Sequence, residues 1–95
     1  MMYAVSDALY DELLARLTDA LAGRDYFSGS VVCSFGGVEC RLTASVIASR
    51  RTEHRPEGTQ RVLADLVPVW WEFHTCTAGA EVLNDFSFGE LRRRL

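Results

Sequence analysis

The stretch "GSVVCSFGGVECRLTASVIAS", residues 29–49, decides the fold. Its two central glycines, Gly36 and Gly37, are typical of a two-residue β-turn, because a turn of the primed type needs a positive φ at both positions. Apolar and polar residues alternate on the C-terminal side of this turn. Alternation with a period of two is typical of an antiparallel strand with one face in the core and the other in water. The stretch therefore predicts a hairpin of two strands, residues 29–35 and 38–49.

A third strand is predicted over residues 61–76, after a loop at residues 52–59 that contains Pro56 and Gly58. The odd-numbered positions of this strand are the more apolar set toward its C-terminal end, and they are assigned to the core face: Leu63, Asp65, Val67, Val69, Trp71 and Phe73. Pro68 lacks the backbone N–H group that a sheet ladder needs. We therefore expect the strand either to lie at an edge or to bulge at the proline.

Two helices are predicted at the two ends of the chain. Residues 6–22 form an amphipathic pattern in which leucines recur every four residues, at Leu9, Leu13, Leu17 and Leu21. Ser6 is placed to cap the first turn of this helix. Near the C-terminal end, Ser87 and Glu90 have the spacing of a capping box, which predicts a short second helix over residues 88–94.

The predicted elements make one α+β domain. The chain of 95 residues reads as an N-terminal helix, a three- to four-stranded antiparallel meander and a short C-terminal helix, with a possible fourth strand within residues 80–86. We expect both helices on the same face of the sheet, which gives a two-layer sandwich. The 48% content of hydrophobic residues and the 11% content of aromatic residues are typical of a folded globular domain.

The composition argues against several classes of function. A net charge of −3 makes nucleic acid an unlikely partner, because such a partner usually requires a basic surface. No apolar run approaches the roughly 20 residues of a membrane helix, and the N-terminal residues lack the basic start of a signal peptide. We therefore expect a cytoplasmic location without a membrane partner. The sequence contains no phosphate-binding glycine motif, so no cofactor is predicted.

The four residues Cys33, Cys40, His74 and Cys76 suggest a zinc site by their chemistry alone. The two-residue turn, however, pairs Cys33 with Cys40 on the core face. His74 and Cys76 share the parity of Glu72, which places them on the outer face. The sheet therefore separates the two pairs, and no metal site is expected. Cys33 and Cys40 are interpreted as small buried hydrophobic side chains, and no catalytic residue is assigned.

A polar cluster is expected on the outer face of the sheet. Pairing the second and third strands around the middle of the 52–59 loop places Arg41 opposite Glu72 and Glu39 opposite His74. A histidine between carboxylates can support acid–base chemistry. A charged, solvated sheet face is the more common explanation for such a group, so a small-molecule or acid–base site is kept as an alternative.

The same pairing separates the two adjacent tryptophans. Trp71 is expected to face the core, whereas Trp70 is expected to face outward beside Ile47 and Leu66. An exposed apolar strip with a tryptophan at its centre is typical of a protein interface. The alternative is that the second helix folds over this face and covers Trp70 within the monomer.

These observations lead to one first hypothesis and two alternatives. The first is a small non-enzymatic protein–protein interaction module that associates with itself as a homodimer or binds another protein. The second is a small-molecule or acid–base site at the polar cluster. The third is weak nucleic-acid binding through the arginines near the 52–59 loop, which are Arg50, Arg51, Arg55 and Arg61.

Overall fold

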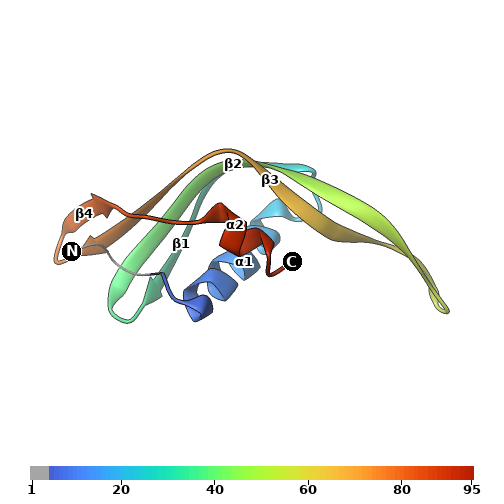
Figure 1. Ribbon diagram of the computed structural model, residues 1–95, viewed down its shortest axis with the longest axis horizontal. Coiled ribbons are helices and arrows are strands. Elements are labelled where there is room, and N and C mark those ends of the chain that lie inside the picture. Colours follow the sequence, from blue (N-terminus) through green and yellow to red (C-terminus); the bar gives the residue numbers. More distant parts are fainter. Residues whose placement is uncertain (1–4) are drawn as a thin grey trace.

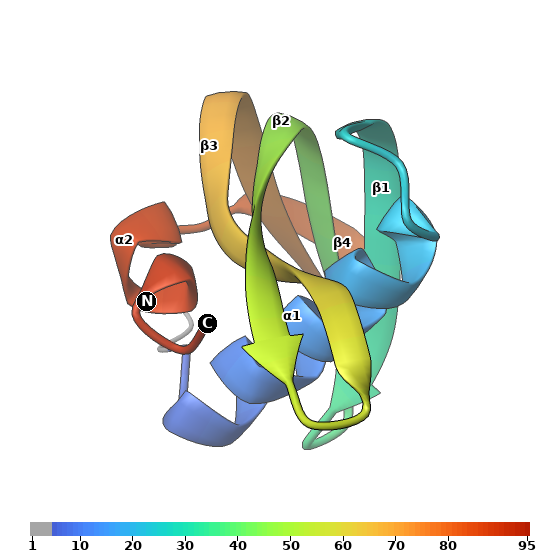
Figure 2. The same cartoon turned by 90° about the vertical axis from the view of Figure 1, so that its right-hand side faces the viewer.

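The computed structural model describes residues 5–95 as two helices and four strands (Figure 1). In chain order these are α1 (Asp7–Leu21), β1 (Tyr26–Phe35), β2 (Val38–Arg55), β3 (Gly58–Thr77), β4 (Ala80–Leu83) and α2 (Phe88–Arg92). The strands form one antiparallel sheet in the order β1-β2-β3-β4, which confirms the predicted helix–meander–helix order and includes the fourth strand. The sheet curls into a half-barrel with both helices on its concave side, an arrangement more curved than the predicted two-layer sandwich (Figure 2).

Both helices begin at the predicted caps. The Ser6 hydroxyl accepts a hydrogen bond from the Leu9 N–H group at 3.2 Å, and the Ser87 hydroxyl accepts one from the Glu90 N–H group at 3.3 Å. Each bond satisfies a backbone donor that the first turn of a helix leaves free. The second helix ends at Arg92, two residues earlier than expected.

The first hairpin also forms as predicted. Gly36 and Gly37 have φ angles of 60° and 79°, which are the positive values that a two-residue turn requires. Cys33 therefore lies directly opposite Cys40, and both side chains are buried on the concave side.

The predicted loop at residues 52–59 is wrong. β2 and β3 continue through this region and meet in a two-residue turn at residues 56–57. β1 pairs with β2 only as far as Ile47, so the remaining part of the hairpin, residues 49–65, projects as a two-stranded ribbon that we call the arm. The arm gives the molecule its longest dimension of 51 Å, against 23 and 19 Å in the other directions (Figure 1).

A bulge follows Pro68, as one of the two expectations for this proline stated. Val69 has no direct partner on β2, because the pairing shifts by one residue at this point. An extra residue reverses the side-chain alternation of a strand. Phe73 is therefore buried on one side of the bulge and Leu66 on the other, although their positions have opposite parity. The assignments of Val67 and Val69 to the core are wrong, since these side chains are 43 and 63% exposed.

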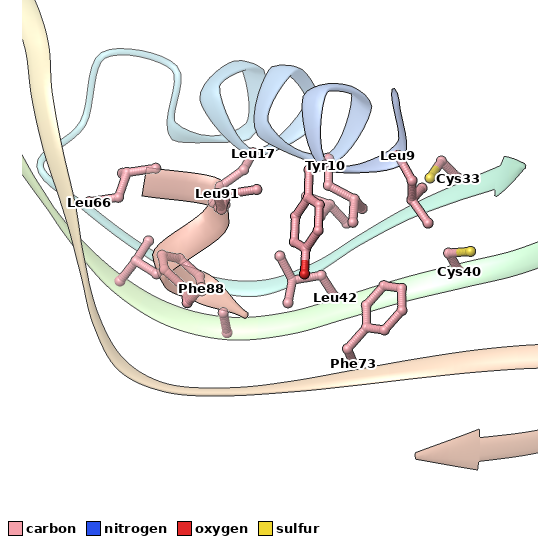
Figure 3. Close-up of a cluster of buried hydrophobic side chains, with 14 of the residues drawn as sticks. Leu9, Tyr10, Leu17, Cys33, Cys40, Leu42, Leu66, Phe73, Phe88 and Leu91 are labelled. Carbon is pink, nitrogen blue, oxygen red and sulfur yellow. The ribbon is translucent and has the colours of Figure 1, made fainter. Parts of the chain in front are cut away.

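The core fills the space between the helices and the concave face of the sheet. Figure 3 shows Leu9, Tyr10 and Leu17 of α1 facing side chains of the sheet. The Tyr10 hydroxyl accepts a hydrogen bond from the Ser87 N–H group at 3.2 Å, and this bond ties α1 to the start of α2. The guanidinium of Arg94 lies 5.0 Å from the centre of the Tyr10 ring. The short second helix is therefore held by tertiary contacts, which a helix of this length needs in order to persist.

Candidate functional sites on the outer face of the sheet

The convex face of the sheet points away from both helices, and we call it the outer face (Figure 1). The extra residues at the two register shifts between β2 and β3 belong to β3, so β2 alternates without interruption. Its odd-numbered side chains, from Glu39 to Arg55, therefore lie on the outer face. Three groups follow one another along this face: a polar pocket, an apolar patch and the outer side of the arm.

The polar pocket lies where β2, β3 and β4 run side by side. Its lining consists of Glu39, Arg41, His74, Thr75, Cys76 and Glu81. Its volume is about 110 Å³. Pockets that hold drug-sized ligands usually measure about 300–1,000 Å³, so this pocket has room only for a few water molecules or a very small ligand.

The pairing inside the pocket differs from the predicted one. The two register shifts move the partners of β2 by two residues along β3, so Arg41 lies opposite His74 and not opposite Glu72. The predicted position of Arg41 opposite Glu72 is therefore wrong. Arg41 instead forms an ion pair and a hydrogen bond with Glu81 of β4. Glu81 was not predicted as a member of this cluster, because the fourth strand was left open. The alternation of "AEVL" after the turn at residues 78–79 is the signal that could have placed it.

His74 is only partly arranged for acid–base chemistry. Its Nε2 atom lies 4.0 Å from a carboxylate oxygen of Glu72, which is beyond hydrogen-bond distance. Its Nδ1 atom is buried and has no hydrogen-bond partner within residues 5–95. The expected neighbour Glu39 lies opposite Cys76 and not opposite His74. Nothing in the described chain orients His74 against a nucleophile, as catalysis by such a pair requires.

Cys33 and Cys40 lie on one side of the sheet and His74 and Cys76 on the other, as predicted. Cys40 pairs with the buried Thr75, whereas His74 and Cys76 line the pocket on the outer face. Burial raises the pKa of Cys40 to about 11 and also raises the pKa of Cys33. Without a bound cation, both groups therefore stay protonated thiols at neutral pH. Across residues 5–95, no three His, Cys, Asp or Glu side chains are grouped so as to hold a metal.

The apolar patch occupies the middle of the outer face, and we call it the outer patch. It consists of Tyr26, Ile47, Val67 and Trp70, whose exposed fractions are 52, 48, 43 and 45%. The first three lie directly opposite one another on β1, β2 and β3. The pairing across three strands therefore makes one continuous apolar surface from residues that are far apart in the sequence.

The tryptophans point to opposite sides of the sheet, as predicted, but Trp71 is 40% exposed and does not belong to the buried core. Trp71 lies on the concave side, where its ring is 5.6 Å from that of Phe88 and its Nε1 atom donates to the Phe86 carbonyl oxygen at 3.3 Å. Trp70 lies on the outer face opposite Ser45. The alternative in which the second helix covers Trp70 is wrong, because α2 docks beneath the sheet and leaves Trp70 exposed (Figure 2).

Leu66 does not belong to the outer patch. It is 0% exposed and lies in the core beside Leu91 of α2 (Figure 3). The prediction placed it with Trp70 because both positions are even-numbered. The bulge at Val69 separates the two residues and reverses the alternation between them, so Val67 takes the outward position.

The four arginines of the expected loop lie on the arm, and three of them are already engaged. Arg50 contacts Asp25 at 3.4 Å, while Arg51 and Arg55 contact the two oxygens of Glu53 at 3.0 and 2.7 Å. Hydrogen bonds from these last two arginines lower the pKa of the Glu53 carboxyl. Only the last of the four lacks an ion pair within residues 5–95. Most of the positive charge available for a phosphate backbone is therefore offset locally.

Comparison with protein-family models, curated proteins and solved structures finds no match to this chain. Within residues 5–95, neither helix is long and apolar enough to cross a bilayer. The function must therefore be argued from the outer face itself.

Proposed function

We propose that the protein is a non-enzymatic protein–protein interaction module that binds through the outer patch. The observation that carries this proposal is the patch itself, in which four large apolar side chains, each about half exposed, meet on a sheet face without a covering helix. Contiguous exposed apolar surface that includes a tryptophan is typical of protein interfaces. A second copy of the chain is the partner that we expect first.

The polar groups beside the patch favour coverage by a partner. The hydroxyl groups of Ser28 and Ser45 hydrogen bond to each other at 2.9 Å, and those of Ser30 and Thr43 do so at 2.7 Å. Burial of a polar group costs free energy when it loses water without gaining a partner. These hydroxyls already have partners across the strands, so a protein that covers Trp70 loses little from their desolvation.

The polar pocket supports a catalytic alternative less well. Its volume of about 110 Å³ is small, and the distance of 4.0 Å between His74 and Glu72 leaves the histidine without an orienting hydrogen bond. An interaction surface needs neither a deep cavity nor a positioned base. For this reason the outer patch carries the proposal.

Nuclear magnetic resonance of methyl-labelled protein tests the role of the outer patch in self-association. The Ile47 and Val67 methyl signals should shift as the protein concentration rises, because these side chains enter the contact. The shift should disappear in Trp70→Ala and persist in Val32→Ala, which changes a side chain of similar exposure outside the patch. Signals that stay constant in the wild-type protein at all concentrations would overturn self-association through this patch.

A further inference from the structure

The two edge strands of the sheet leave backbone groups unpaired along their outer sides. β1 forms one edge and β4 the other. An open edge is a row of N–H and C=O groups to which another strand can bind, and proteins usually protect such edges. The two edges therefore invite a comparison of how each is protected.

The hairpin of β3 and β4 determines which groups of β4 are free. Its two-residue turn at residues 78–79 begins the ladder with the pair Thr77–Ala80. From such a turn, hydrogen-bonded and non-hydrogen-bonded pairs alternate along the strands. On β4, the residues in non-hydrogen-bonded pairs are Glu81 and Leu83. Their backbone N–H and C=O groups consequently point away from β3, toward the open edge.

Two hydrogen bonds verify this alternation. The Asn84 N–H group donates to the Phe73 carbonyl oxygen at 2.7 Å, which is the bond that the alternation requires beyond Leu83. The same rule, applied from the turn at residues 36–37, makes the Val32 carbonyl point outward from β1. The Arg16 side chain of α1 indeed donates to this oxygen at 3.2 Å, outside the strand ladder.

Within residues 5–95 the β1 edge is therefore partly blocked, whereas no hydrogen bond of the described chain occupies the β4 edge. An ion pair with Glu12 of α1, at 2.8 Å, holds the Arg16 side chain beside β1. Within residues 5–95, no side chain hydrogen bonds to the outward backbone groups of Glu81 or Leu83. Val82 and Leu83 are also 52 and 59% exposed. β4 contains no proline, and among residues 5–95 its short length of four residues is its main protection.

We propose that β4 of one copy pairs antiparallel with β4 of a second copy across a two-fold axis at Val82, so that the two sheets join edge to edge. This contact uses a surface separate from the outer patch and goes beyond the proposed function. Glu81 of each copy faces Leu83 of the other, and each such pair exchanges two backbone hydrogen bonds. The contact therefore contains four backbone hydrogen bonds.

The side chains around β4 fit a second copy of the same strand. A two-fold axis at Val82 brings the Val82 side chains of the two copies together, which covers an exposed apolar surface. The same axis brings two Glu81 carboxylates near each other, and like charges across strands are unfavourable. Arg41 offsets this repulsion, because its ion pair with Glu81 neutralises the carboxylate within each copy. The ion pair in the polar pocket thus allows the β4 strands of two copies to pair without repulsion between their Glu81 carboxylates.

Sedimentation equilibrium of matched variants tests the edge contact. Leu83→Pro removes an outward N–H group at an edge position, where proline is tolerated in a strand. We use it in the Trp70→Ala background, in which the outer patch is disabled. Trp70→Ala alone should sediment as a dimer. Adding Leu83→Pro removes two of the four hydrogen bonds and should raise the dissociation constant at least about tenfold, whereas adding Leu83→Ala, which keeps the N–H group, should raise it less.

Amide hydrogen exchange of the wild-type protein provides a second measurement that needs no variant. The amides of Glu81 and Leu83 should exchange more slowly as the protein concentration rises, while the outward amide of Ser34 on β1 should not change. The edge contact would be refuted if the Trp70→Ala protein remained monomeric. It would also be refuted if the amide exchange rates of Glu81 and Leu83 did not depend on protein concentration.

The two proposed contacts can fail separately. Wild-type protein with both contacts should grow beyond a dimer, because two isologous contacts on one chain build an open assembly. If the Ile47 and Val67 methyl signals do not shift with concentration, the outer-patch contact is ruled out and the edge dimer remains. If the amide exchange of Glu81 and Leu83 does not slow with concentration, the edge contact is ruled out and the patch dimer remains.

Discussion

Arg94→Ala should lower the free energy of unfolding by about 2 kcal/mol, because Arg94 ties the C-terminal end of the chain to α1. Its guanidinium lies 5.0 Å from the centre of the Tyr10 ring, a cation–π contact worth about 0.5–1 kcal/mol. Its Nη1 atom donates to the Glu90 carbonyl oxygen at 2.7 Å, a hydrogen bond worth about 1 kcal/mol. Ion pairs with Asp7 and Asp11 add little, since both carboxylates are largely exposed to water.

Arg93→Ala is the matched control for this prediction. Arg93 carries the same charge one position earlier, but its side chain is 76% exposed, against 19% for Arg94, and its ion pair is with Glu90 of its own helix. Its loss should cost less than about 0.5 kcal/mol. Urea unfolding followed by tryptophan fluorescence measures both, and about 2 kcal/mol should lower the midpoint of thermal unfolding by roughly 8–16 °C. Equal losses for the two variants would refute the reasoning.

Three further predictions concern the bulge and the cysteines. Leu66→Ala should cost about 2–5 kcal/mol in urea unfolding and Val67→Ala much less, because only Leu66 is buried; the reverse order would contradict the assigned alternation. In the native protein a thiol reagent should modify Cys76 first, with Cys33 and Cys40 reacting only on unfolding, and one fast-reacting thiol should be counted. Burial raises the pKa of Cys40 to about 11, so this thiol stabilises the fold fully below the ordinary pKa of 9.0 and loses this effect as the pH rises to about 11; Cys33, whose pKa is also raised, acts in the same direction. The urea midpoint should therefore fall over that range, and it should fall less in the variant with alanine at both positions.

The sequence predicted those parts of the fold that depend on neighbouring residues. Gly36 and Gly37 define a turn whose pairing follows directly from its length, so the position of Cys33 opposite Cys40 could be counted without a structure. Ser6 and Ser87 accept hydrogen bonds from residues three positions later, a relation that is also local. Each of these predictions needed only a few consecutive residues.

The pairing of β2 with β3 depended on bulges that composition does not reveal. Pro68 indicated that a bulge could form here, but Val69 is apolar like its neighbours, so the sequence did not show which residue lacks a partner or that the alternation reverses there. Parity counted from the residues beyond Pro68 placed Trp70 and Trp71 correctly, because that segment lies on one side of the bulge. The same count failed for Leu66 on the other side. The candidate polar cluster was therefore located on the correct face but with the wrong partners.

The arm was missed for a different physical reason. Both faces of its outer part meet water, so these residues show no alternation of apolar and polar side chains. Charged residues with a proline and a glycine are typical of loops, and they are equally compatible with a solvated ribbon. The turn at residues 56–57 was centred correctly, and the third strand was predicted from residue 61, but the strand residues 50–55 and 58–60 on either side of the turn were not predicted.

Because the arm projects outside the half-barrel, its length can change without changing the packing of the core. Its strands leave the half-barrel together and are closed by the turn at residues 56–57, so extra residues inserted symmetrically on both sides of the turn would extend the ribbon outward. Insertion of two residues per strand would keep each existing side chain on its present face, whereas one per strand would exchange the faces of the tip. The turn is thus a site where a foreign sequence could be grafted and carried away from the body of the protein, with its reach adjusted in steps of about 7 Å.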